Sequence, residues 1–402
     1  MKKIFLYTLL TILFLASILG CTTPYAYQNN GFEDVVVIEA TLTNEYKTQE
    51  VKISRTYSLE ENFPQFESQA VVYITDNLGN KYEFDQNTAS YTSITPFQAL
   101  PDREYQLHIL TKNGKTYESS IEKLTTPNQI SSVVPTAVTK NGILGVEITV
   151  NSSDPTNTSK YYRYEYDETY KVVAPMWHPD EAIPAGNVVT LRKRTTEART
   201  CYSNQKSEEI LLTNTNNLSE DIVSNFPIKF ISSKDPIIKN RYSILVKQYV
   251  QSLTAHTYYE TLKEISNNGN VLSQTQPGFL YGNIKSIDSP GEKVIGFFDV
   301  SSYSEKRLFF NFTDLFQGVL PPSYPYYCPA PIPDSDIAEY YFNNCYSTNP
   351  NSTCQGPTIV QLIESRIKVY YPTEGPLYIL YPIECGDCTS FSSNIKPSFW
   401  ID

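Results

Sequence analysis

Residues 104–121 read EYQLHILTKNGKTYESSI, which is the pattern of two β-strands joined by a tight turn. Apolar and polar side chains alternate in the first arm, and this predicts a strand with one buried face, formed by Tyr105, Leu107 and Ile109. Asn113-Gly114 stands between the arms, and this dipeptide is the strongest short signal for a hairpin turn. His108 falls on the polar face of the first arm, so we expect it on the solvent side. The stretch therefore predicts an antiparallel hairpin.

The same pattern recurs upstream of this hairpin. Residues 70–84, AVVYITDNLGNKYEF, have the pattern of two strands around a turn at residues 77–80, and further alternating stretches begin at Val35 and Glu50. Six or seven short strands in about 90 residues predict a β-sandwich of immunoglobulin-like or transthyretin-like type. We place this N-terminal unit at residues 34–125, followed by a linker near residues 125–130.

Residues 126–402 are expected to form a second, larger β-rich region. In KYYRYEYDETYKVV, residues 160–173, the alternation places Tyr162, Tyr164 and Tyr166 on one face and Tyr161, Arg163 and Glu165 on the other. Further strands are expected at GVEITV (145–150), NRYSILVKQYV (240–250), KVIGFFDVSS (293–302) and KRLFFNF (306–312). The predicted fold class is therefore mostly β in both regions.

One amphipathic helix is expected after the strand at residues 240–250. Ser252 can cap its start, and Gly269 can end it. Large or apolar side chains recur at helical spacing and form one stripe, made of Ala255, Tyr258, Tyr259, Leu262 and Ile265. His256 lies one residue outside that stripe.

The charge balance argues against nucleic acid as a partner. The chain has 32 Lys and Arg residues against 43 Asp and Glu residues, a net charge of −11 over 402 residues. Nucleic-acid-binding proteins instead carry basic stripes. The 32 tyrosines suit either a sugar-binding surface or strand residues with one hydrated end. The strand interpretation is favoured, since Tyr accompanies Val, Ile and Thr in β-strands.

The first 21 residues, MKKIFLYTLLTILFLASILGC, have the pattern of an export signal, with a basic start and an apolar core. The ending Ile18-Leu19-Gly20-Cys21 resembles the lipobox of bacterial lipoproteins, in which the cysteine sulfur takes a diacylglycerol. The alternatives are an ordinary secretory signal or a membrane-spanning anchor, although the apolar stretch is barely long enough to span a bilayer. We expect residues 1–20 to be a lipoprotein signal peptide and residues 21–33 a lipidated tether.

Acyl chains on Cys21 would hold the protein at a membrane. The expected location is the cell envelope, anchored by lipid to the outer membrane. The periplasmic and surface-exposed faces both stay open, because no acidic run follows Cys21. No further apolar run of spanning length follows either, and no cofactor is expected beyond the covalent lipid.

Export would place the other cysteines in an oxidising compartment. Their even number suits three disulfides among Cys201, Cys328, Cys345, Cys354, Cys385 and Cys388. The Cys385-Gly-Asp-Cys388 spacing also suits a redox couple or half of a zinc site. A redox couple is disfavoured because the following residues, TSFSSNIKP, are not helical in pattern, and zinc is disfavoured because the chain has no second such pair. By proximity, Cys345 would pair with Cys354. Cys201 and Cys328 would then share Cys385 and Cys388 in an order that the sequence leaves open. The C-terminal segment from about residue 321 is thus expected to be loop-rich and held by disulfides.

No motif in the chain indicates catalysis, and we find no nucleophile elbow, phosphate-binding loop, dinucleotide fingerprint or metalloprotease motif. The three histidines are far apart in the sequence. His178 is the most suggestive of them, since Trp177 precedes it and Asp180 and Glu181 follow, and such a loop suits contact with a ligand. A partly exposed loop that Trp177 anchors is nevertheless the favoured interpretation. Asp334 and Asp336 in PDSD have carboxylates that suit calcium, but the sequence shows no further oxygen ligands at a patterned spacing, so a calcium site is not favoured. We therefore expect a non-enzymatic protein with no metal.

Several segments together resemble a family of Bacteroidota lipoproteins known as domain of unknown function 4249. They are the lipobox at Cys21, VVIEATLTNEYKTQEVKISRT, GKTYESS, YYRYEYDETY, GNIKSIDSPGEKVIGFFDVSSYSEKRLF and the ending CGDCTSFSSNIKPSFW. At Tyr170 relatives often carry Trp, which would fill the same place in a core. The resemblance implies an outer-membrane-associated lipoprotein, all-β at its N-terminus and often encoded beside TonB-dependent transporters. It carries over no catalytic residues.

Three functions are compatible with these features. The first is a non-enzymatic, lipid-anchored envelope protein that binds a ligand or assists an outer-membrane transporter of the TonB-dependent type. The second is a surface adhesin or assembly subunit, which an exposed edge strand open to a donor strand would favour. The third is an envelope hydrolase acting on glycans or peptides, which a pair of carboxylates at a catalytic separation or a buried His–acid pair would favour.

Overall fold

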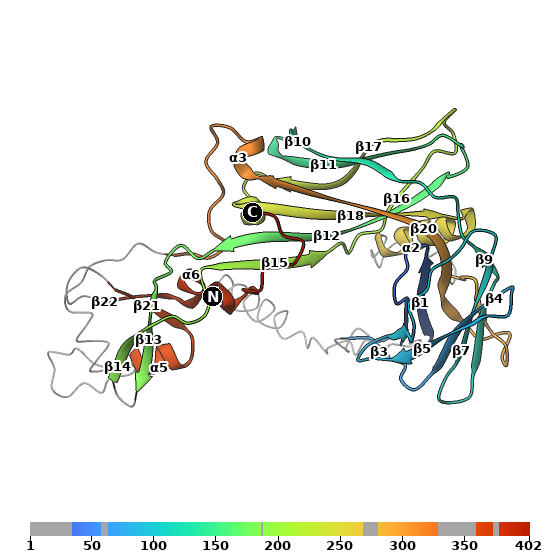
Figure 1. The fold of residues 1–402 in the computed structure, drawn as a ribbon, viewed down its shortest axis with the longest axis horizontal. Helices are drawn as coiled ribbons and strands as arrows, with labels where there is room; N and C mark the ends of the chain where they lie inside the picture. Colours follow the sequence, from blue (N-terminus) through green and yellow to red (C-terminus); the bar gives the residue numbers. More distant parts are fainter. Residues whose placement is uncertain (1–33, 58–62, 186–187, 268–279, 329–358, 373–377) are drawn as a thin grey trace, which may run out of the picture.

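Figure 1 shows the computed structural model, which describes residues 34–57, 63–185, 188–267, 280–328, 359–372 and 378–402. The fold is mostly β, as the alternating patterns predict. Its largest sheet has 15 strands, and a three-stranded sheet lies over part of it. The described chain forms an arch, with the first strands in one arm and the C-terminal hairpins in the other (Figure 1).

The N-terminal arm contains nine short strands. They are β1 (Val36–Thr43), β2 (Glu50–Arg55), β3 (Gln65–Phe66), β4 (Val71–Asp76), β5 (Lys81–Gln86), β6 (Tyr91–Ser93), β7 (Glu104–Leu110), β8 (Thr116–Ser119) and β9 (Glu122–Lys123). The strands curl around one apolar core, to which β1, β2, β4, β5, β6, β7 and β8 each contribute buried side chains. This arrangement confirms the predicted sandwich-like character of the unit.

The hairpin predicted at residues 104–121 is present. β7 pairs with β8 in antiparallel register, and Gly114 takes the positive φ of 85° that the turn requires. Tyr105, Leu107 and Ile109 are buried, as the alternation predicts. His108 lies on the other face but is half-buried there, because its ring stacks on Tyr73 with the ring centroids 4.8 Å apart.

The second region is a two-layer packing of sheets. Its upper layer consists of β10 (Ile130–Lys140), β11 (Ile143–Asp154) and β17 (Asp221–Ser232), and its lower layer contains β12 (Tyr161–Val173), β15 (Thr200–Lys206), β16 (Leu211–Asn214) and β18 (Arg241–Gln251). Tyr162 and Tyr164 of β12 point into the core between the layers, with 0% exposure. The alternation therefore turns Arg163 and Glu165 toward the opposite face, as predicted.

A single long strand, β20 (Val294–Asn311), connects the two regions. Its first half pairs with β1 in parallel register, and its second half pairs with β18 in antiparallel register. The two strands expected at residues 293–302 and 306–312 are thus one strand, because the residues between them, Tyr303, Ser304 and Glu305, also pair with β18. β19 (Ile284–Ser286) also joins the N-terminal arm by pairing with β8. The first sheet therefore includes residues from both sides of the boundary expected near residue 125.

The predicted helix is α2 (Leu253–Asn267), which lies at the corner between the two regions (Figure 1). Ser252 caps it, since its Oγ accepts a hydrogen bond from the N–H of Ala255 at 3.2 Å. Ala255 and Tyr258 of the predicted stripe pack against Phe297 of β20. His256, outside the stripe, is nevertheless buried at 4% exposure, because β12 covers it. Gly269 lies outside the described residues.

The C-terminal arm is built from short elements. They are β13 (Asp180–Ala185), β14 (Val188–Lys193), α5 (Ile359–Glu364), β21 (Lys368–Pro372), β22 (Tyr378–Pro382), α6 (Ile383–Gly386) and η2 (Cys388–Ser390), while η1 (Pro236–Ile238) and α3 (Phe312–Leu315) flank the lower sheet. Two disulfides hold this arm, Cys201–Cys388 and Cys328–Cys385. Both cysteines of the CxxC motif thus bond to other segments. Cys345 and Cys354, with Asp334 and Asp336, lie outside the described residues.

The leader and tether predicted at residues 1–33, with Cys21, also lie outside the described residues. In the part of the chain that the structure describes, no helix combines the length and the apolar character needed to cross a bilayer.

Candidate functional site

A groove of about 560 Å³ lies where the N-terminal arm meets the lower sheet of the second region. One wall comes from β1 and β2, the other from β12 and β18, and α2 and residues 207–210 complete it. Among its lining residues are Glu39, Gln49, Lys52, Arg163, Tyr249 and Tyr259. The groove exists because β20 pairs with both β1 and β18, which brings their strands to one corner.

Arg163 is the most unusual residue of the groove. It sits on the outer face of β12 and is only 7% exposed. Its guanidinium carbon lies 4.2 Å from the ring centroid of Tyr249 and 4.7 Å from that of Tyr259, so aromatic rings cover it from two elements. Its Nη1 donates a hydrogen bond to Glu165, whereas its Nε is buried without a partner.

A second buried charge lies near Arg163. Asp299 of β20 is 1% exposed and accepts hydrogen bonds from Ser301 Oγ at 2.6 Å and Gln251 Nε2 at 3.3 Å. Burial raises the pKa of Asp299, although the bond from Ser301 and the charge of Arg163 oppose this rise. Burial opposes the charge of Arg163, but the surrounding tyrosines and carboxylates outweigh it and raise the pKa of the guanidinium. Arg163 is therefore a permanently charged group in a dry setting.

The rim of the groove has both signs of charge. Glu39, Glu50, Glu208 and Glu209 are exposed there, together with Lys47 and Lys52. Each of these lysines faces an acid, since Lys47 bonds to Glu45 and Lys52 is the cross-strand partner of Glu39. The rim thus carries an excess of carboxylates above a single deep guanidinium, and this separation of charge suits a polar ligand with charges of both signs.

Comparison with known proteins matches residues 22–307 to a family described as Domain of unknown function (DUF4249). The match covers more than half of the chain. The chain belongs to the DUF4249 family. No curated protein shows significant similarity to it. All residues that line the groove fall inside the matched segment, whereas the ending Cys385–Trp400, part of the resemblance found in the sequence, lies beyond it.

Trp177 and His178, the ligand-contact candidates from the sequence, lie away from the groove of this DUF4249 chain. Trp177 packs against a cluster that includes the Cys201–Cys388 disulfide, and its Nε1 is buried without a partner. His178 Nδ1 accepts a hydrogen bond from the N–H of Asp180 at 3.0 Å. These contacts fit the alternative interpretation of an anchored loop.

The other two histidines also have local contacts. His108 contacts Thr75 and Glu118 on its own sheet, at 2.9 and 3.1 Å. His256 packs against Tyr161, with 5.1 Å between the ring centroids, and burial lowers its pKa. None of the three histidines lines the groove. Within the described ranges, no group of three His, Cys, Asp or Glu side chains is arranged to hold a metal ion.

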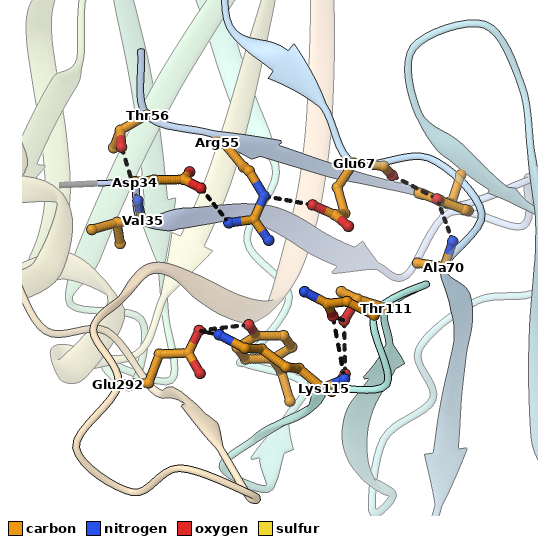
Figure 2. A network of polar contacts seen from close by, with 12 residues as sticks. Asp34, Val35, Arg55, Thr56, Glu67, Ala70, Thr111, Lys115 and Glu292 are labelled. Atoms are coloured by element: carbon orange, nitrogen blue, oxygen red, sulfur yellow. Dashed lines mark hydrogen bonds and ion pairs between the residues drawn. The ribbon is translucent and has the colours of Figure 1, made fainter. Parts of the chain in front are cut away.

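A polar network closes the end of the N-terminal arm where the described chain begins (Figure 2). Arg55 donates to Asp34 at 3.0 Å and to Glu67 at 2.7 Å, and thereby ties the chain before β1 to the loop before β4. Glu292 accepts hydrogen bonds from Lys115 at 2.8 Å and from the Tyr117 hydroxyl at 2.9 Å. Because these charges pair with one another, they are suited to holding segments together rather than to binding a ligand. Arg55 fixes the start of β1, and Glu292 attaches the chain before β20 to β8.

Sequence reasoning placed Arg163 on the correct face of its strand but did not identify it as a site residue. The alternation of side chains around Arg163 predicts its face of the strand. The groove, however, also depends on β1, which is far away in the sequence. An arginine between tyrosines on an otherwise outward-facing strand position was the only local signal.

Proposed function

We propose that this chain is a lipid-anchored, non-enzymatic protein of the cell envelope that binds a small solute in the groove and assists an outer-membrane transporter. The observation that carries the binding role is the buried Arg163, held between Tyr249 and Tyr259 in a cavity of about 560 Å³. A cavity of this size falls within the range of small-molecule sites, about 300–1,000 Å³. The lipobox at Cys21 supports the anchor, and the implied association of the family with TonB-dependent transporters supports the partner.

Binding fits the groove better than catalysis does. The carboxylate of Glu165 is engaged by Arg163 and by the Tyr249 hydroxyl, and that of Asp299 is engaged by Ser301 and Gln251. A general acid or base must reach the reacting atom in a suitable protonation state. Among the described residues, the His–acid contact of His178 with Asp180 at 3.8 Å lies at the partly exposed start of β13 and not in the groove.

The adhesin alternative gains little support from the sheet edges. The outer strands of the three-stranded sheet, β10 and β17, contain Pro135 and Pro227, and each proline removes a backbone donor from its strand. In the large sheet, the C-terminal segment bridges to β15 through Tyr202 and Ser393. An added donor strand therefore has obstacles at these three edges.

The anchor and the transporter association can be tested together in membranes. Cells expressing the full chain would be labelled with radioactive palmitate, and the chain would be purified in mild detergent, with Cys21→Ala as the matched control. The proposal predicts label in the wild-type chain only and co-elution of a large β-barrel protein. An unlabelled chain recovered from the cytoplasmic fraction would contradict the anchor, and a labelled chain that elutes alone would contradict the transporter role.

A further inference from the structure

Resting on the binding role just proposed, we infer that the groove selects an amino acid or short peptide with a free carboxylate. The ligand's carboxylate pairs with Arg163, and its ammonium group faces the glutamates of the rim. Three features of the groove lead to this class of ligand. They are the N–H donors that Arg163 presents, the side chain of Glu165 that accepts from one of them, and the charge of the rim.

The first feature is the way in which Arg163 presents its donors. Two tyrosine rings already pack against the guanidinium, with the centroids of Tyr249 and Tyr259 at 4.2 and 4.7 Å from its carbon, so a ligand is expected to reach it along its edge. The N–H groups lie along that edge, in a planar fork that matches the two oxygens of a carboxylate. The Nε donor is buried and has no partner, so the fork has unused hydrogen-bonding capacity.

The second feature is Glu165, which occupies the place that a ligand carboxylate would take. Its side chain is 39% exposed, against 8% for Arg163, so it can turn toward solvent while Arg163 stays fixed. It also accepts a hydrogen bond from the Tyr249 hydroxyl at 3.2 Å, a donor that an incoming carboxylate can reuse.

The third feature is the rim. Four glutamates line the groove, and Glu39 faces Lys52 whereas Lys47 bonds to Glu45, so Glu50, Glu208 and Glu209 leave the rim acidic. A simple anion would be repelled as it enters, because like charges disfavour one another at close range. A zwitterion instead matches both parts of the groove, because its positive group faces the carboxylates of the rim and its negative group pairs with the buried Arg163.

The two tyrosines argue against a carbohydrate in this groove. Recognition of a sugar ring by stacking needs an open aromatic face. Tyr249 and Tyr259 each turn one face toward Arg163, and Tyr249 also packs against Tyr303 with 5.3 Å between the ring centroids. Their role here is to hold the guanidinium rather than to form a platform.

The test is isothermal titration calorimetry of the full chain in mild detergent with four probes. These are tetra-alanine with free termini, its C-terminal amide, its N-acetyl form and maltotriose. We expect free tetra-alanine to bind, amidation to weaken binding at least tenfold and acetylation to weaken it severalfold. Arg163→Lys should weaken binding of the free peptide, since an ammonium lacks the planar fork, and Arg163→Gln should remove the preference for a free carboxylate.

Two controls keep the outcome clear. Arg307→Gln changes another arginine that is stacked on an aromatic ring, 3.5 Å from the Phe399 centroid and outside the groove, and should bind like the wild type. Thr41→Trp fills the groove from β1 and should abolish binding. Equal binding of the amide, or no binding of any probe, would overturn the ligand class. Binding of maltotriose that Thr41→Trp abolishes would overturn the ligand class and leave the proposed binding role intact.

Discussion

Arg163 is a charged side chain in a place where an isolated charge would be costly. Removing an ion from water costs several kcal/mol unless neighbouring groups compensate for the loss of hydration. Two tyrosine rings, Glu165 and Asp299 supply that compensation here. An apolar side chain of the same volume would fill the position at lower cost. A cation held this deep beside a cavity is therefore better suited to recognition than to stability.

Asp76 is a carboxylate whose surroundings act on its pKa in two directions. Burial raises the pKa, but hydrogen bonds from Asn80, Leu78 and Arg103 outweigh burial and lower it to about 2. Since the folded-state pKa lies below the ordinary value, ionised Asp76 stabilises the fold above about pH 4, and this contribution disappears as the pH falls toward 2.

The first prediction concerns the acid dependence that Asp76 produces. Asp76→Asn cannot ionise, so its free energy of unfolding should fall less than that of the wild type between about pH 4 and pH 2. Urea unfolding at a series of pH values measures this difference. Asp85→Asn, an exposed position on β5, is the control. Identical acid profiles for Asp76→Asn and the wild type would contradict this explanation.

At the scale of elements, the segment before β19 crosses β20 at two glycines. A Cβ on Gly282 would lie 1.5 Å from the carbonyl oxygen of Gly296, and a Cβ on Gly296 would lie 2.2 Å from that of Ile38. Backbone atoms cannot move aside as a flexible side chain can, so the segment at Gly282 can pack this closely on β20 only without a side chain.

The second prediction follows from this contact. Gly282→Ala should lower the free energy of unfolding by at least about 2 kcal/mol, because the new methyl group forces β20 away from its neighbours. Gly291→Ala is the matched control, since its Cβ would meet open space, and it should change the stability by less than about 0.5 kcal/mol. Chemical denaturation compares the two. A Gly282→Ala chain as stable as the Gly291→Ala chain would refute the close contact.

The third prediction concerns the two disulfides, which attach the C-terminal arm at different places. Cys201–Cys388 ties β15 to η2 over a sequence separation of 187 residues, and Cys328–Cys385 closes a separation of 57 residues. Replacing both cysteines of either bridge with serine should cost roughly 2–5 kcal/mol and make the C-terminal arm more sensitive to protease. Limited proteolysis followed by mass spectrometry locates the cuts. Cuts that appear first in the N-terminal arm would contradict the local role of these bridges.

At the scale of the whole molecule, β20 joins strands of the N-terminal arm and of the second region into one sheet, because it pairs with both β1 and β18. It contributes Phe298 to the core of the N-terminal arm and Phe310 to the core of the second region. Neither core is complete without it. We therefore expect the two cores to depend on each other in folding.

The fourth prediction is that both cores unfold together. Chemical unfolding followed by tyrosine fluorescence and by circular dichroism should give coincident transitions. Gly282→Ala, which disturbs the N-terminal part, should shift both signals equally. Two separate transitions, or a shift in one signal alone, would show that the arms are independent domains joined by a passive strand.

The same long strand explains how far the sequence could predict this structure. Local signals were reliable, because the Asn113-Gly114 turn, the Ser252 cap and the alternation around Arg163 depend on neighbouring residues only. Pairing of β1 with β20 and the order of the disulfides are contacts between distant segments, and no local pattern specifies them. The sequence predicted separate strands at residues 293–302 and 306–312, whereas residues 303–305 also pair with β18 and make them one strand. The groove was missed for this reason, since its two walls meet only through β20.

The most direct test of this account is to identify what the groove holds when the protein comes from its own membranes. The full chain and its Thr41→Trp variant would be purified in mild detergent and their bound small molecules compared by mass spectrometry. We expect about one equivalent of a zwitterionic solute with the wild type and its loss from the variant. The same solute content in both preparations would contradict the claim that this groove is the binding site.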